Sequence, residues 1–185
     1  MTAFSRRRFL AAASAPLALA ACGNGVGSPG GEMIDARVDA AIAFMEDTLP
    51  ETRDLRARSA GMLMMPLMTE AGLGIGGAFG RGALRVDGVT VDYYSATAAS
   101  VGLQIGAQQY AHALFFMTPA ALSNFRQSPG WVAGADLEYA ASSNARAFTT
   151  DTTSLTTPVV AVIFGQAGLL AGATIEGQKY NRIIP

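Results

Sequence analysis

Apolar side chains recur at helical spacing in the segment from Ile34 to Leu49. They stand three or four residues apart, at Ile34, Val38, Ile42, Met45 and Leu49. This spacing predicts an amphipathic helix of about four turns that ends at Pro50. The polar face of this helix is mostly acidic, which favours a helix that covers the core over one that lies on an anionic membrane. A second short helix is expected near residues 51–60.

From residue 62 the pattern becomes that of strands. Met62–Met68 is a continuous apolar run, and the segment Leu84–Val91 alternates around Asp87-Gly88. These two residues suit a two-residue type I′ turn, so the segment predicts a β-hairpin. The turn would fix three cross-strand pairs: Val86–Val89 and Leu84–Val91 on the core face, and Arg85–Thr90 on the other face.

Glycines are concentrated between the apolar run and this hairpin. Gly72, Gly74 and Gly77 formally match the G-x-G-x-x-G pattern of dinucleotide-binding proteins. That function requires a helix directly after the glycines, whereas here a hairpin is expected, so no nucleotide cofactor is predicted. In an extended chain Gly72, Gly74 and Gly76 share one bare face, which allows another backbone to approach or the sheet to bend sharply.

Further strands and one helix are expected in the second half of the chain. Thr118 followed by Pro119 predicts the N-terminus of a short helix, Pro119–Gln127, whose Leu122 and Phe125 face the core. The expected strands are 101–106, 110–117, 133–139, and a last hairpin of 159–164 and 169–175. The sequence therefore predicts an α+β fold: N-terminal helices on a strongly curved, mainly antiparallel sheet or barrel with one inserted short helix.

The first residues have the pattern of an export signal. Residues 5–10, which include Arg6 and Arg7, resemble the twin-arginine motif, and an apolar run too short for a membrane span follows them. The run ends at Leu19-Ala20-Ala21-Cys22, which resembles the lipobox of bacterial lipoproteins, so Cys22 is the predicted site of a covalent lipid anchor. We expect a signal peptide at residues 1–21, a flexible tether at 22–33, and one domain at 34–185.

Composition and charge exclude several classes of function. Cleavage of the signal leaves 10 of the 13 basic residues against 14 acidic ones, a formal charge of about −4, which disfavours nucleic-acid binding. A single Cys and a single His exclude clustered Cys or His metal sites. His112 is expected to be a structural residue inside a strand, and Asp136 with Glu138 a solvated strand face. No catalytic residues, metal or cofactor are predicted.

Several motifs resemble the SYLF-domain proteins, from about Asp35 to the C-terminus. They are Pro66 with the glycine-rich segment 71–84, Tyr93-Tyr94, Ser100–Gln108, Phe116-Met117-Thr118, Ala121-Leu122, Phe125, Trp131, Gly168-Leu169, Ala171-Gly172 and Glu176-Gly177. The resemblance implies a non-catalytic lipid-binding domain whose partner is membrane phospholipid. Members that bind phosphoinositides look basic at the first helix, whereas this helix is acidic.

The sequence thus predicts an exported lipoprotein on the periplasmic side of the bacterial envelope. Gly23 after Cys22 favours the outer over the inner membrane. The alternatives are a scaffolding lipoprotein with an unknown protein partner, and a hydrolase that uses His112. Because the mature charge is negative, lipid contact must be local: an apolar opening with arginines at its rim. The candidate lipid-binding residues are Arg81, Arg85, Tyr93, Tyr94 and Trp131; the alternative is that these aromatics are core residues and these arginines are solvated.

Overall fold

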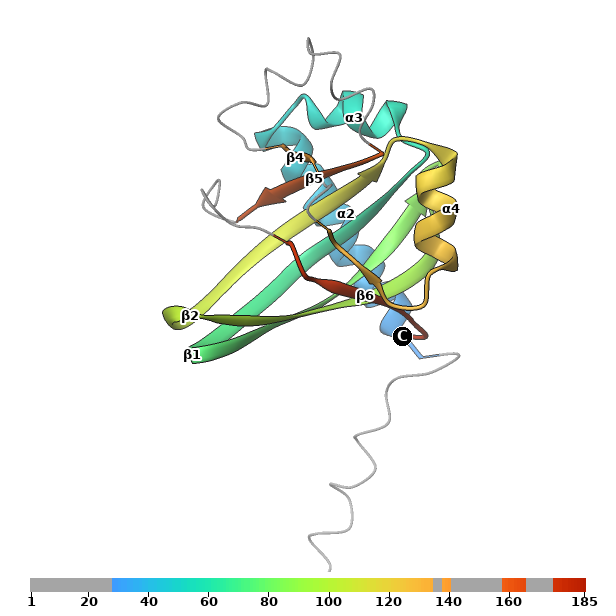
Figure 1. The fold of residues 1–185 in the computed structure, drawn as a ribbon. Coiled ribbons are helices and arrows are strands. Elements are labelled where there is room, and N and C mark those ends of the chain that lie inside the picture. Colours follow the sequence, from blue (N-terminus) through green and yellow to red (C-terminus); the bar gives the residue numbers. More distant parts are fainter. Residues whose placement is uncertain (1–27, 135–137, 141–157, 166–174) are drawn as a thin grey trace, which may run out of the picture.

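The computed structural model describes residues 28–134, 138–140, 158–165 and 175–185 (Figure 1). The predicted signal peptide lies outside this range. The described elements are α2 (Gly30–Thr48), α3 (Thr52–Arg58), β1 (Gly61–Val86), β2 (Val89–Phe116), α4 (Pro119–Gln127), β3 (Trp131–Val132), β4 (Glu138–Ala140), β5 (Val159–Phe164) and β6 (Lys179–Ile183). Helix α2 begins at Gly30, inside the segment expected to be a tether. No described helix is long and apolar enough to cross a membrane.

Strands β1 and β2 form one long hairpin. Its turn residues have positive φ, 50° at Asp87 and 79° at Gly88, as the predicted type I′ turn requires. Arg85 pairs with Thr90 as predicted, but Leu84 pairs with Asp92 because Val91 is an extra residue in a bulge. The predicted Leu84–Val91 pair is therefore wrong. Val86 and Val89 do pair, yet not on the core face, since the side chain of Val89 is 64% exposed.

The long hairpin curves into a half-barrel. The segments 101–106 and 110–117 were predicted as separate strands, but residues 101–106 and 110–116 both belong to β2. This strand pairs with β6 at 93–97 and with β5 at 111–116. A side chain at Gly82 would collide with the carbonyl oxygen of Met64, and one at Gly80 with that of Leu67. A close backbone approach of the kind that glycine permits therefore occurs at Gly80 and Gly82.

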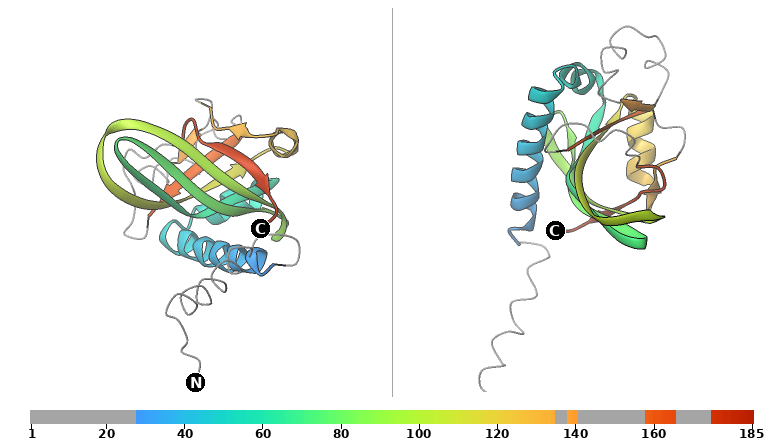
Figure 2. Two further views of the ribbon diagram at one scale, coloured as in Figure 1. Left: turned by 90° about the horizontal axis from the view of Figure 1, so that it is seen from below. Right: turned by 90° about the vertical axis from the view of Figure 1, so that its left-hand side faces the viewer.

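Two helices cover opposite faces of the sheet (Figure 2). Alternation along β1 sends Met62 and Met64 toward α2, whereas Leu63 and Met65 belong to the core on the side of α4. Helix α2 contributes Ile34, Val38, Ile42 and Met45 to the first core, as its periodicity predicts. Helix α4 contributes the buried Phe125 to the second, with Leu122 packed at its margin.

The α+β fold with a strongly curved, mainly antiparallel sheet is confirmed. The described strands form one sheet in the order β3-β6-β2-β5-β4, with β1 on β2, and only β4 and β5 pair in parallel. Thr118 caps α4, because its side chain accepts a hydrogen bond from the Ala121 amide. Strand β6 and the short β3 were not predicted. The predicted strand 169–175 lies outside the described residues except for Ile175.

Candidate functional site

Two of the predicted lipid-binding residues, Arg85 and Tyr93, are held by α2. Arg85 lies 2.7 Å from an Asp39 carboxylate oxygen and 3.3 Å from one of Asp35. Thr90 and Tyr93 each donate a 2.7 Å hydrogen bond to Asp35. We call these five residues the α2 cluster. The side chain of Arg85 is only 14% exposed, so it joins the hairpin to the helix and is not the free cation that was expected.

The environment of Tyr93 keeps its hydroxyl protonated. Burial, and then the hydrogen bond to the negatively charged Asp35, raise the pKa of Tyr93 from 10.0 to about 12. The hydroxyl therefore stays protonated and donates its hydrogen bond to Asp35 at any physiological pH. This interaction fixes the start of α2 against β2.

The remaining predicted residues do not gather at one surface. Tyr94 is buried and its ring stacks at an angle on Phe125 of α4, with 4.8 Å between ring centroids. Trp131 packs edge-on against Phe125 at 5.4 Å. Arg81 is exposed on β1. Arg85 and Tyr93 therefore belong to the α2 cluster, Tyr94 and Trp131 pack with the core on the α4 side, and Arg81 is exposed to solvent. The five residues do not line a single opening.

His112 lies inside the half-barrel, as its strand position predicted. It is fully buried, and its Nε2 lies 2.7 Å from the Tyr180 hydroxyl. The Gln178 side chain donates to the Tyr110 hydroxyl at 2.6 Å and accepts from Tyr180 at 3.1 Å. Burial lowers the pKa of His112 to about 3, so the imidazole is neutral. This arrangement is that of a structural polar network within a core.

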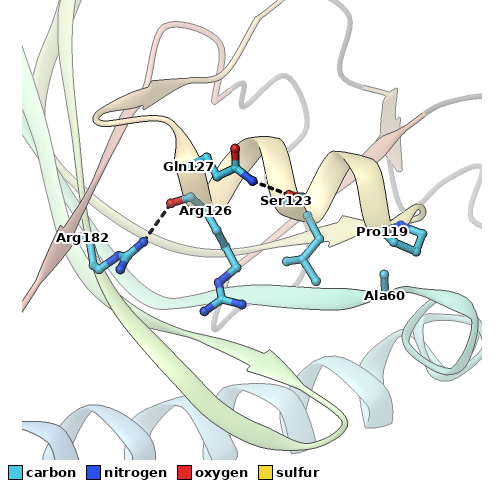
Figure 3. Close-up of a pocket in the computed structure, with 7 residues that line it drawn as sticks. Ala60, Pro119, Ser123, Arg126, Gln127 and Arg182 are labelled. Atoms are coloured by element: carbon cyan, nitrogen blue, oxygen red, sulfur yellow. Dashed lines mark hydrogen bonds between the residues drawn. The ribbon is translucent and has the colours of Figure 1, made fainter.

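An open groove runs along α4, on the face of the sheet opposite α2 (Figure 3). Its volume is about 480 Å³, and its lining residues are Ala60, Pro119, Leu122, Ser123, Arg126, Gln127 and Arg182. Ala60 and Pro119 lie at one end of the groove and the two arginines at the other (Figure 3). The lining of the groove therefore changes from apolar to cationic along its length. The sequence predicted an apolar opening with arginines at its rim, but placed it at Arg81 and Arg85.

The two arginines of the groove share one carboxylate. Arg126 Nε lies 3.0 Å, and Arg182 Nε 3.6 Å, from the oxygens of Asp92. Arg182 also donates a 2.8 Å hydrogen bond to the Arg126 carbonyl oxygen, which ties β6 to the end of α4 (Figure 3). The arginine side chains are 43% and 55% exposed, whereas that of Asp92 is 13% exposed. The groove thus presents cations to solvent and keeps their counter-ion below them.

A buried hydroxyl lies beside these charges. No described residue accepts a hydrogen bond from the Tyr94 hydroxyl. Burial, and then the negative charge of Asp92, raise the pKa of Tyr94, whereas a hydrogen bond with Arg182 and the positive charges of Arg182 and Arg126 oppose that rise. The hydroxyl is therefore a donor without an acceptor, next to the cationic end of the groove.

Sequence reasoning missed Arg126 and Arg182 because their proximity depends on the unpredicted strand β6. The available signal was the alternation in β2, which sends Asp92 and Tyr94 to the face opposite Tyr93. Cys22, Arg6, Arg7 and Asp136 lie outside the described residues. Among the residues that the structure does describe, no group of three or more His, Cys, Asp or Glu side chains could hold a metal ion.

A family model matches part of this chain. Residues 97–182 match the Ysc84 model, described as "Las17-binding protein actin regulator". No curated protein matches the chain at a significant level. The matched range begins within β2 and ends at Arg182, so it includes α4 and both arginines of the groove. The match supports a SYLF domain in this part of the chain.

Proposed function

We propose that the protein is an exported, membrane-anchored lipoprotein whose non-catalytic SYLF domain binds lipid at the cell envelope. The match over residues 97–182 supports a domain of this family. The observation that carries the proposal is the groove along α4, which places apolar residues beside two exposed arginines. An amphiphile with an anionic head and an apolar tail has the matching chemistry.

The interior supports a non-catalytic role. The neutral His112 is fully buried and its Nε2 is engaged by Tyr180, so it does not reach the groove or a solvent-borne substrate. A general base must lie within hydrogen-bond reach of the proton that it removes. The hydrolase alternative therefore has no support from the position of its proposed base.

The proposal of a lipid anchor is supported by the sequence alone. Cys22 in the lipobox-like segment would receive the lipid, and its acyl chains would hold the protein firmly, since each buried methylene contributes about 0.8 kcal/mol. Cys22→Ser should move the protein from the membrane fraction to the soluble fraction or block its processing. If the variant stays in the membrane fraction after a high-salt wash, the anchor is not at Cys22.

The export route is tested separately. Replacing Arg6 and Arg7 together with Lys should trap a folded precursor inside the cell, because twin-arginine transport requires the arginine pair. Normal export of this variant would show that the general secretory route suffices. Neither result bears on the function of the domain.

Lipid binding by the domain is tested without the anchor. The full chain with Cys22→Ser is titrated with dihexanoyl phosphatidylglycerol, which is soluble as single molecules, and binding is followed by calorimetry. We expect saturable binding near one lipid per chain. If neither this lipid nor dihexanoyl phosphatidylcholine binds, lipid binding fails, and the scaffolding alternative, a lipoprotein with a protein partner, replaces it.

A further inference from the structure

The cationic end of the groove has one positive charge more than its own residues neutralise. Arg126 and Arg182 contribute two positive charges, and both contact the single carboxylate of Asp92. Each arginine approaches Asp92 through Nε, and no described residue accepts a hydrogen bond from the terminal amino groups of Arg126. A guanidinium presents these groups in a planar fork that fits phosphate oxygens. The groove therefore suits a monoanion.

The buried hydroxyl of Tyr94 is the second observation that indicates a ligand. A buried donor without an acceptor costs free energy, and such groups are rare in folded proteins. The Tyr94 hydroxyl is in this state next to Arg182 and Arg126. Tyr94 does not line the groove and its hydroxyl is covered, so a headgroup oxygen would supply the missing acceptor only where the exposed arginine side chains move aside.

The position of the groove relative to the start of the domain indicates where its ligand comes from. Arg182 is three residues from Pro185, whose carbonyl oxygen accepts a 2.9 Å hydrogen bond from the Ser28 hydroxyl. Ser28 follows Cys22 by six residues, a span of at most about 20 Å. A domain anchored through Cys22 would therefore hold the cationic end of the groove close to the membrane surface.

We propose that the groove binds the phosphodiester headgroup of an anionic membrane phospholipid between Arg126 and Arg182, with the first part of an acyl chain along Leu122 and Pro119. This inference rests on the lipid-binding function proposed above and assigns it a site and a class of headgroup. A phosphodiester carries one negative charge, which equals the surplus of the groove. The overall negative charge of the mature chain does not prevent this contact, because the two arginines are local to the groove.

The experiment uses the full chain with Cys22→Ser and three soluble probes: dihexanoyl phosphatidylglycerol, dihexanoyl phosphatidylcholine and inorganic phosphate. Arg126→Gln and Arg182→Gln should each weaken binding of phosphatidylglycerol at least about tenfold, because each removes a charge-assisted hydrogen bond. Arg81→Gln is the matched control: it removes an exposed arginine of β1 that does not line the groove. Its affinity should equal that of the parent chain.

Tyr94→Phe separates a ligand contact from a structural role. Since no described residue accepts a hydrogen bond from this hydroxyl, its removal should leave the melting temperature unchanged or slightly raised. The same change should weaken phosphatidylglycerol binding severalfold. An unaltered affinity would show that the hydroxyl does not meet the headgroup and would contradict this part of the site.

The outcomes distinguish the site from the function. If phosphatidylglycerol and phosphatidylcholine bind equally to all variants, the domain binds lipid but the headgroup site at the arginines is wrong. If inorganic phosphate binds as tightly as phosphatidylglycerol, the groove is a free-anion site and the inference is also wrong. If no lipid binds to any variant, the proposed function itself fails.

Discussion

The two charged clusters on either side of the half-barrel have opposite balances of charge. In the α2 cluster one arginine, Arg85, contacts two carboxylates, those of Asp35 and Asp39. In the groove two arginines contact one carboxylate, Asp92. The side chain of Arg85 is largely covered, whereas those of Arg126 and Arg182 are about half exposed. The first cluster neutralises its cation, and the second leaves a positive charge at the surface.

This difference shows why an arginine beside aromatic residues is a weak predictor of an anion site. Arg85, with Tyr93 near it in the sequence, has the expected composition, but its neighbours in space are acidic residues of α2. What matters is the local ratio of cations to carboxylates and the exposure of the cation. By both measures the groove, and not the α2 cluster, is suited to an anionic partner.

The largest effect on stability is expected from Arg85→Gln. The substitution leaves the partly covered carboxylate of Asp35 and the exposed carboxylate of Asp39 without their cation, so the free energy of unfolding should fall by about 1–2 kcal/mol. Urea unfolding of the full chain measures this loss. Arg81→Gln serves as the control and should change the same quantity by less than about 0.5 kcal/mol. Equal losses of stability in both variants would show that the contacts of Arg85 with Asp35 and Asp39 do not stabilise the fold.

Local patterns predicted most of the fold. The helical spacing from Ile34, the cap at Thr118 and the turn at Asp87-Gly88 depend on neighbouring residues, and each is present in the structure. The bulge at Val91 and strand β6 were missed for different reasons. A bulge depends on how the hairpin meets the rest of the sheet, and β6 buries only Tyr180 among its five residues, so its alternation is weak.

A groove with the predicted kind of lining lies at a different position from the one predicted. The negative charge expected after cleavage of the signal led to the prediction of a local opening with arginines, whereas the choice of Arg81 and Arg85 followed their proximity to the glycines in the sequence. The actual groove joins Ala60, helix α4 and Arg182, which are far apart along the chain. The topology of the sheet brings these distant segments together, and this topology could not be predicted from the sequence alone.

Tyr93→Phe tests the α2 cluster with a smaller effect. Loss of the 2.7 Å hydrogen bond to Asp35 should lower the free energy of unfolding by about 1 kcal/mol at neutral pH. The pKa of Tyr93 is about 12 in the folded protein and about 10 when unfolded, so the folded state binds more protons between these values. Its stabilising contribution is therefore complete below pH 10 and is lost as the pH rises toward 12.

The comparison of unfolding free energies at pH 9 and pH 11 measures this contribution. The parent chain should lose more stability over this interval than Tyr93→Phe does. Tyr110, whose pKa burial also raises to about 12, remains in both proteins and provides a common background. If the two proteins lose equal amounts of unfolding free energy, folding does not raise the pKa of Tyr93, and the contact with Asp35 does not stabilise the protonated hydroxyl.

The smallest effect on stability is expected from Arg126→Gln in the groove. Its ion pair with Asp92 is partly exposed, and pairs of this kind contribute about 0.2–1 kcal/mol. Arg182 stays beside Asp92 in the variant, so the loss should lie at the low end of this range. Salt screens exposed charges strongly, since the Debye length falls from about 10 Å at 0.1 M to about 3 Å at 1 M. The difference in unfolding free energy between Arg126→Gln and the parent chain should therefore vanish in 1 M NaCl, while that of Arg85→Gln should persist because its cation is covered. Unfolding curves at the two salt concentrations decide the matter: if salt abolishes both differences, the α2 cluster is as open to solvent as the groove, and the contrast between them does not hold.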